Sequence, residues 1–102
     1  GGFYPFQLGR LQRAADINPV LAETMQRSPV DYLDNMVFDT VIFEPHAVEF
    51  LIQVVGAERV VLGTDQPFLL SDLTLTRMDE LDEATRRLLL EQNAKRAFNL
   101  GD

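Results

Sequence analysis

The stretch that decides the fold is Arg59–Phe68, R-V-V-L-G-T-D-Q-P-F. Its apolar run V-V-L is typical of a parallel strand that is buried on both faces, and we predict a strand over residues 60–64. Asp65 follows at the carboxyl end of this strand, and Pro67 prevents a helix from starting at once. In α/β sheets and barrels, functional groups lie in the loops beyond the strand carboxyl ends. Asp65 is therefore either a catalytic or metal-binding carboxylate or one that caps loop amides, and this stretch leaves both interpretations open.

A second strand and a helix precede this stretch. Residues 37–43, V-F-D-T-V-I-F, are mostly β-branched or aromatic, and they predict a strand that is buried on both faces after Asp39. From Pro45 the apolar residues take helical spacing, and Gly56 ends the predicted helix. Its apolar stripe consists of Val48, Leu51, Ile52 and Val55. The order strand, helix, strand predicts one βαβ unit with parallel strands and a right-handed crossover.

Prolines divide the first third of the chain into helical segments. Pro5 suits the first turn of a helix whose apolar positions are Leu8, Leu11 and Ala15. Asn18-Pro19 breaks that helix and starts another, for which we predict a buried side made of Val20, Leu21 and Met25. Ser28 is the predicted N-cap of a short helical segment, residues 30–33, with Pro29 at its first position.

The last third is also predicted to be helical. A short helix is expected in the polar stretch from Ser71 to Met78. Asp82 is the predicted N-cap of a stronger helix over residues 83–92, whose first turn is acidic as the helix dipole favours. We predict that Asn93 caps a final turn, A-K-R-A-F, which Asn99-Leu100-Gly101 closes.

The composition is that of one small globular domain. Of the 102 residues, 46% are hydrophobic and 25% are charged. The 16 acidic and 9 basic residues give a net charge of -7, which argues against nucleic acid or an anionic membrane as a partner. Cysteine is absent, so no disulfide framework or thiolate nucleophile is expected, and no apolar run approaches the roughly 20 residues of a membrane span. We expect a soluble, cytoplasmic protein.

Five segments, in order along the chain, resemble the carboxyl-terminal portion of the metal-dependent amidohydrolase superfamily, in the branch of aminocarboxymuconate-semialdehyde decarboxylase and related aromatic-acid decarboxylases and hydrolases. The segments are G-G-F-Y-P-F-Q-L-G-R (1–10), S-P-V-D-Y-L (28–33), F-D-T-V-I-F-E-P (38–45), V-G-A-E-R-V-V-L-G-T-D-Q-P-F (55–68) and L-D-E-A-T-R-R-L-L-L-E-Q-N-A-K-R-A-F-N-L (81–100). The resemblance implies a (β/α)₈ TIM barrel of roughly 250 residues, of which residues 1–102 form one partial domain that follows the sixth strand.

The resemblance also implies site residues. Asp65 becomes the carboxylate after strand eight, which in the family ligates a divalent ion or takes a proton from its bound water; zinc is the first expectation and manganese the second. Arg10 matches an arginine that grips a substrate carboxylate, often across a homodimer interface, and the alternative is a solvated helix arginine. Phe68 is expected to line the substrate pocket, with an ordinary core aromatic as the alternative.

Some residues depart from the family pattern. Gln66 stands where relatives usually have Tyr, and Phe43 stands where some relatives have His. The only histidine, His46, is expected on the surface or behind the ligands, because one His without a partner is a poor metal site. The family's metal-binding histidines fall upstream of Gly1. A catalytic zinc ordinarily needs three protein ligands, so we expect a fragment that is inactive alone.

These observations favour a metal-dependent enzyme that acts on a small carboxylated substrate, aromatic or unsaturated. Non-oxidative decarboxylation is the first choice, and hydrolysis of a lactone or amide is the second, because the same metal-bound water serves both. A rival hypothesis is a non-catalytic module that associates with itself through exposed strand edges. A phosphate-binding loop at Gly63 is disfavoured, because no glycine-rich loop leads into a helix there.

Overall fold

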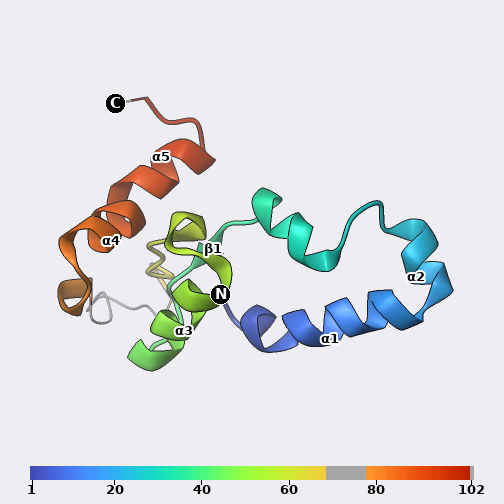
Figure 1. Cartoon of the computed structure of the whole chain (residues 1–102). Coiled ribbons are helices and arrows are strands. Elements are labelled where there is room, and N and C mark those ends of the chain that lie inside the picture. The colour runs from blue at the N-terminus through green and yellow to red at the C-terminus, as the bar shows by residue number, and fades with distance from the viewer. Residues whose placement is uncertain (69–77, 102) are drawn as a thin grey trace.

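The chain forms a helix-rich α/β structure in which a small strand pair lies between a helical arm and a closing helix (Figure 1). It is a computed structural model, and it describes residues 1–68 and 78–101. The strands are β1 (Phe38–Asp39) and β2 (Val60–Val61). The helical elements, in chain order, are α1 (Tyr4–Ile17), α2 (Pro19–Thr24), the 3-10 turn η1 (Pro29–Asn35), α3 (Pro45–Val55), the 3-10 turns η2 (Ala57–Arg59) and η3 (Met78–Glu80), α4 (Glu83–Arg87), the π-helical turn η4 (Leu88–Gln92) and α5 (Asn93–Ala97).

The arm consists of α1, α2 and η1, and its breaks occur where the sequence predicts them. Asn18 serves both helices: its N–H donates to Ala14 at the end of α1, and its side chain accepts from the N–H of Val20, 3.0 Å away, at the start of α2. The predicted buried side of α2 is wrong, however. Val20 is 69% exposed and Leu21 is 37% exposed, because the described residues supply no layer that covers this helix.

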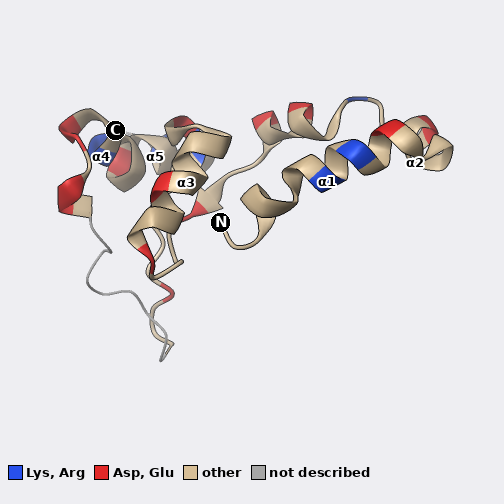
Figure 2. Cartoon of the chain, turned by 60° about the horizontal axis from the view of Figure 1, so that its bottom comes forward, with Lys and Arg blue, Asp and Glu red and all other residues tan. Residues whose placement is uncertain are grey.

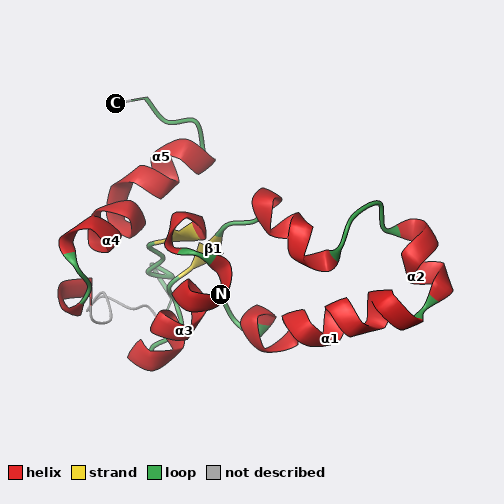
Figure 3. Ribbon diagram, viewed as in Figure 1, coloured by secondary structure: helices red, strands yellow, loops and turns green. Residues whose placement is uncertain are grey.

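The two strands pair in parallel, with Phe38 opposite Val60 and Asp39 opposite Val61, so the predicted βαβ unit is confirmed. Both strands are much shorter than predicted, as the small yellow arrows of Figure 3 show. The first ends early because the Asp39 carboxylate accepts a hydrogen bond from the N–H of Val41, 2.8 Å away. This local bond turns the chain out of the ladder.

Burial alternates along the strand pair. Phe38 and Val60 point into the core, whereas the Asp39 side chain is 53% exposed and Val61 is half-buried. The prediction that the second strand is buried on both faces is therefore wrong for the described residues. After Asp39, where the sequence predicts that the first strand is buried on both faces, Thr40 is buried but Val41 and Ile42 are only half-buried. Successive residues of a strand point to opposite faces, and the described helices cover only one of the two.

The crossover helix α3 begins and ends at the predicted residues. The Glu44 side chain accepts a hydrogen bond from the N–H of His46 at 3.0 Å, which caps the first turn. Gly56 ends the helix with φ of 88°, a left-handed value that a side chain would strain. The core contains the buried side chains Leu33, Phe38, Leu51, Val55, Val60, Met78 and Leu89.

The closing segment is one continuous helical run from α4 through η4 to α5, rather than two helices. Asp82 caps its start, where the N–H of Thr85 donates to the carboxylate at 3.0 Å, as predicted. Its end is also as predicted: Asn99 has φ of 53°, and Leu100 donates to Lys95 at 2.9 Å. The prediction that Asn93 caps a separate turn is wrong, because this residue is buried inside the run.

Two further points complete the fold. The short helix predicted from Ser71 falls on residues 69–77, which lie outside the described residues, and Met78 begins η3. In the part of the chain that the structure describes, every helix is too short or too polar to cross a lipid bilayer.

Candidate functional site

Asp65 lies in the turn that follows β2, at the carboxyl end of the strand pair. Its side chain is exposed and its φ is 57°, a left-handed value that is uncommon outside glycine and several-fold enriched in aspartate. The turn is closed by the N–H of Phe68, which donates to the carbonyl oxygen of Asp65 at 3.0 Å. The carboxylate therefore stands at the edge of the sheet where functional groups gather in parallel α/β folds.

Gly63 lets the segment that leads to Asp65 lie against β1. A Cβ at this position would lie 2.8 Å from Cγ2 of Val41 and 2.9 Å from Cβ of Asp39. Both distances are too short for a side chain, so only glycine permits this approach. Thr40, which is 2% exposed, accepts a hydrogen bond from the N–H of Gly63 at 3.2 Å. In the sequence, the one indication of this contact is a hydroxyl in a run of β-branched and aromatic residues.

Asn93 fastens the closing helix to the start of β2. It is 1% exposed, and its side-chain amide donates to the carbonyl oxygens of Val60 at 2.6 Å and Ala57 at 2.7 Å. Its own oxygen accepts from Arg96 at 3.1 Å. Asn93, whose position in the sequence predicts a local cap, therefore joins two segments that are far apart in the chain.

Arg59 makes a second set of bonds at the amino end of β2, away from Asp65. Its guanidinium donates to the carbonyl oxygens of Leu33 at 3.1 Å and Val55 at 3.0 Å, and it pairs with Asp34 at 2.6 Å and with Glu58. The hydrogen bond to Asp34 raises the pKa of Arg59 above its ordinary value. Arg59 thus gives a charged donor to two carbonyl oxygens at the end of the strand pair opposite Asp65, which indicates a structural role.

Arg10 lies apart from Asp65. It is exposed on α1, which packs against α2, η1 and α3 and extends away from the strands (Figure 1). Figure 2 shows basic residues in two bands on α1 and acidic residues spread over α2, α3 and α4. Within residues 1–68 and 78–101, Arg10 forms no hydrogen bond or ion pair. The fold of this chain thus groups Asp65 with Phe68 in one turn and leaves Arg10 outside it.

Phe68 and His46 are both on the surface. The side chain of Phe68 is 67% exposed in this chain, and its place in the substrate pocket stays a prediction. His46 is exposed on the first turn of α3, where its Nδ1 lies 3.3 Å from Oε2 of Glu49, in agreement with the expected surface position. Neither ring forms part of the hydrophobic core.

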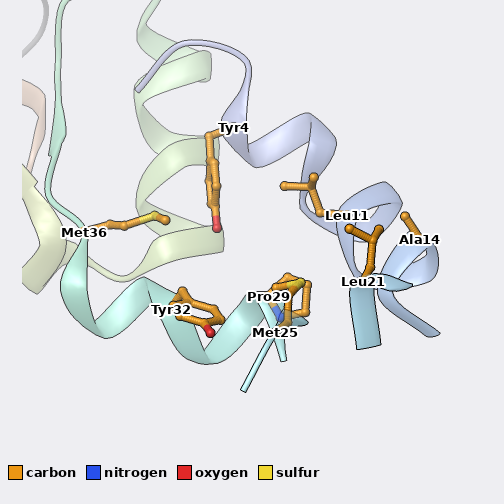
Figure 4. Close-up of a pocket in the computed structure, with 8 residues that line it drawn as sticks. All are labelled: Tyr4, Leu11, Ala14, Leu21, Met25, Pro29, Tyr32 and Met36. Carbon is orange, nitrogen blue, oxygen red and sulfur yellow. The ribbon is translucent and has the colours of Figure 1, made fainter. Parts of the chain in front are cut away.

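A cavity of about 360 Å³ lies within the arm, and Asp65 is not among the residues that line it (Figure 4). Its walls are almost entirely apolar, and the hydroxyls of Tyr4 and Tyr32 are the polar groups among its lining side chains. The other lining residues are Leu11, Ala14, Leu21, Met25, Pro29 and Met36. A site for a carboxylated substrate needs a charged or donor group, and this cavity offers no cation.

Comparison with known proteins identifies the family. The family model described as amidohydrolase matches residues 14–100. The chain belongs to the amidohydrolase family. This result confirms the resemblance that the five segments indicate.

Two relatives place the amidohydrolase chain more narrowly. It is 31% identical to 2-amino-3-carboxymuconate-6-semialdehyde decarboxylase of Dictyostelium discoideum over 99 residues, which cover 92% of this chain and 28% of the relative. It is 33% identical over 107 residues to the protein of the same name from Caenorhabditis elegans, with coverage of 100% and 27%. The chain thus spans less than a third of the length of these relatives.

Solved structures share the fold of this amidohydrolase chain. The apo crystal structure of Metarhizium anisopliae IDCase matches 100% of the chain and 32% of its own length, with a TM-score of 0.76 and 24% identity. The crystal structure of 5-carboxyvanillate decarboxylase from Sphingomonas paucimobilis matches 97% of the chain and 31% of its own length, with a TM-score of 0.80 and 20% identity. The backbone therefore has the fold of part of a TIM-barrel decarboxylase.

Amidohydrolases are generally metal-dependent, so the side chains of this chain that could bind a metal ion are of interest. A catalytic zinc ordinarily needs three protein ligands. No group of three His, Cys, Asp or Glu side chains suited to a metal ion is present in the described ranges. Asp65 is a suitable single oxygen donor, but the described part of this amidohydrolase chain does not complete a catalytic metal centre.

Proposed function

We propose that this chain supplies the Asp65 end of the active site of a metal-dependent decarboxylase that acts on a small carboxylated substrate, aromatic or unsaturated. The observation that carries the proposal is the position of Asp65, at the carboxyl end of β2, in a chain whose relatives are named decarboxylases over nearly its whole length. Carboxylates at this edge of a TIM barrel are the groups that do chemistry.

Asp65 is the proposed metal ligand and proton acceptor. Its carboxylate is a hard oxygen donor that suits zinc, the first choice, or manganese. A bound divalent ion supplies a Lewis acid that polarises an oxygen of the substrate or of water. The remaining ligands are proposed to come from outside the described residues, and the chain alone is expected to be inactive.

The chain is the proposed carboxyl-terminal part of a (β/α)₈ barrel, with β1 as strand seven and β2 as strand eight. Support comes from the open face of the strand pair and from the apolar side chains that the arm leaves exposed, which include Phe3, Phe6, Ile17 and Val20. A stable domain buries such surface. Further strands and helices of the same barrel would cover it.

Arg10 and Phe68 are the proposed substrate-binding residues. A guanidinium binds a carboxylate through two parallel hydrogen bonds, and Arg10 is exposed and ready to donate them. Because α1 extends away from β2, Arg10 is proposed to serve the site of the second subunit of a homodimer. Phe68, on the turn that carries Asp65, would form one wall of the pocket.

The product of the intact gene tests the proposal. We expect release of carbon dioxide from carboxylated aromatic or muconate-type acids, and a chelator should abolish it. Asp65→Asn should lower kcat by at least about 100-fold, with Asp79→Asn as the control on another exposed carboxylate. Arg10→Gln should raise KM by about 10- to 100-fold, with Arg13→Gln as the control on the same helix. Ring opening without carbon dioxide would instead establish a hydrolase, and an active Asp65→Asn variant would refute the assignment of the site.

A further inference from the structure

Where β1 ends, the hydroxyl of Thr40 replaces the backbone hydrogen bonds that a longer strand would make to the facing segment. Beyond Asp39 the chain turns away from β2, because the N–H of Val41 bonds the Asp39 carboxylate and the N–H of Ile42 bonds the carbonyl oxygen of Thr40 at 2.8 Å. Among the described residues, therefore, no strand backbone pairs with the peptide groups of Gly63 on the facing segment. Thr40 Oγ1 lies 3.2 Å from the nitrogen and 3.5 Å from the oxygen of Gly63, and it accepts from the former and donates to the latter.

This contact is partly buried and closely packed. Thr40 is 2% exposed and Gly63 is half-buried, and Gly63 approaches Asp39 and Val41 so closely that even one added carbon would clash. Such close packing leaves little room for a water molecule in place of the hydroxyl. If the hydroxyl is removed, the N–H of Gly63 loses this partner, which is costly for a partly buried donor.

The segment held by Thr40 leads directly to Asp65. Gly63 is two residues before Asp65, and on the other side the N–H of Phe68 holds the carbonyl oxygen of Asp65. The left-handed backbone of Asp65 is an unfavourable conformation that persists only when its surroundings enforce it. Thr40 anchors one end of that short segment, and the turn to Phe68 anchors the other.

We propose that Thr40 is a positioning residue for Asp65: its hydroxyl fixes Gly63 and so sets the direction in which the Asp65 carboxylate leaves the sheet. The inference rests on the proposed role of Asp65. Thr40 touches neither substrate nor metal in this assignment. Its effect passes through the backbone of residues 63–65.

The test uses three variants of the intact gene product. Thr40→Val keeps the shape and removes the hydroxyl, Thr40→Ser keeps the hydroxyl, and Thr24→Val is the control, since the hydroxyl of Thr24 also donates to a backbone oxygen but lies on α2. We expect Thr40→Val to lower kcat by about 10- to 100-fold with little change in KM, as is typical for residues that support catalytic groups. Thr40→Ser should restore kcat to within about threefold, and Thr24→Val should match the parent.

A structural measurement accompanies the kinetics. Amide hydrogen exchange at Gly63, followed by NMR, should be about fivefold faster in Thr40→Val than in the parent or in Thr40→Ser, and the amide resonance of Asp65 should shift in Thr40→Val alone. If Thr40→Val does not fold, amide hydrogen exchange is measured in the parent protein instead. The inference requires that the Gly63 amide of the parent be protected from exchange, and exchange at the rate of an exposed amide would overturn it.

The outcomes separate this inference from the proposed function. If the parent protein has no decarboxylase activity, the proposed function fails. The two NMR measurements, amide exchange at Gly63 and the amide resonance of Asp65, then decide by themselves whether Thr40 positions Asp65. If the parent is active and Thr40→Val keeps its kcat, the inference is overturned even when exchange at Gly63 is faster. A Thr40→Ser variant as slow as Thr40→Val would also overturn it, since the hydroxyl would not be the cause.

Discussion

Removal of the Asn93 side chain should strongly destabilise the chain, because this residue joins the closing helix to the strand pair. Asn93 is buried, and its amide donates one short hydrogen bond to the carbonyl oxygen of Val60 and another to that of Ala57. In Asn93→Ala the oxygen of Val60 loses this donor, whereas the oxygen of Ala57 keeps the backbone N–H of Val60 as a donor. The bond to Val60 is buried and the bond to Ala57 is partly buried, so water can easily reach only the carbonyl oxygen of Ala57.

The expected loss follows from these two bonds. An unsatisfied buried acceptor at Val60 costs about 1–3 kcal/mol, and the net loss of one hydrogen bond to Ala57, whose oxygen keeps the N–H of Val60, adds about 1 kcal/mol. The free energy of unfolding should therefore fall by about 2–4 kcal/mol. For a domain of about 100 residues each kcal/mol shifts Tm by about 4–8 °C, so a decrease of at least about 10 °C is expected.

Urea denaturation followed by circular dichroism measures this loss. Asn35→Ala is the matched control, because Asn35 is exposed at the end of η1 and should change stability by less than about 0.5 kcal/mol. Asn93→Asp keeps the shape but removes the donor when the carboxyl is ionised. Burial raises the pKa of such a carboxyl, so the stability of Asn93→Asp should recover as the pH falls and the acid can donate again. A loss below about 0.5 kcal/mol in Asn93→Ala would refute the reasoning.

Three further predictions concern stability and can be measured by the same unfolding experiment. Gly63→Ala should cost about 1–3 kcal/mol, because its Cβ would overlap atoms of Asp39 and Val41. Gly9→Ala, in open space on α1, should instead stabilise by about 0.5–1 kcal/mol, and equal effects of the two changes would contradict the packing argument. Arg59→Lys should cost about 1–3 kcal/mol, since one ammonium cannot reach all four acceptors of the guanidinium. An unchanged free energy of unfolding would show that the hydrogen bonds of Arg59 are dispensable for stability. Hydrogen bonds from the side chain and backbone of Thr85 lower the pKa of Asp82 in the folded state. The ionised Asp82 therefore stabilises the fold above its unfolded pKa of about 3.9, and this stabilisation is lost as the pH falls through the folded value. Asp82→Ala should make the free energy of unfolding less dependent on pH in this acid range.

The candidate site was only partly predictable. The position of Asp65 after a strand follows from the apolar run before it, and the family assignment follows from five short segments, because both depend on residues that are adjacent in the chain. The surroundings of Asp65 cannot be predicted from adjacent residues. Thr40 and Gly63 are separated by 23 residues, and their contact depends on where β1 leaves the ladder. The exposure of Phe68 likewise depends on what the fold brings near it.

The sequence by itself determined the kind and order of the elements and most of their boundaries. Proline, glycine and capping side chains such as Asn18, Glu44 and Asp82 act on backbone groups within a few residues, so their effect is visible in the sequence. Only the tertiary structure decided the short strands, the exposed face of α2 and the buried role of Asn93, whose amide bonds Val60 across 33 residues. Those features depend on which distant atoms meet, and a local pattern contains no information about the partner.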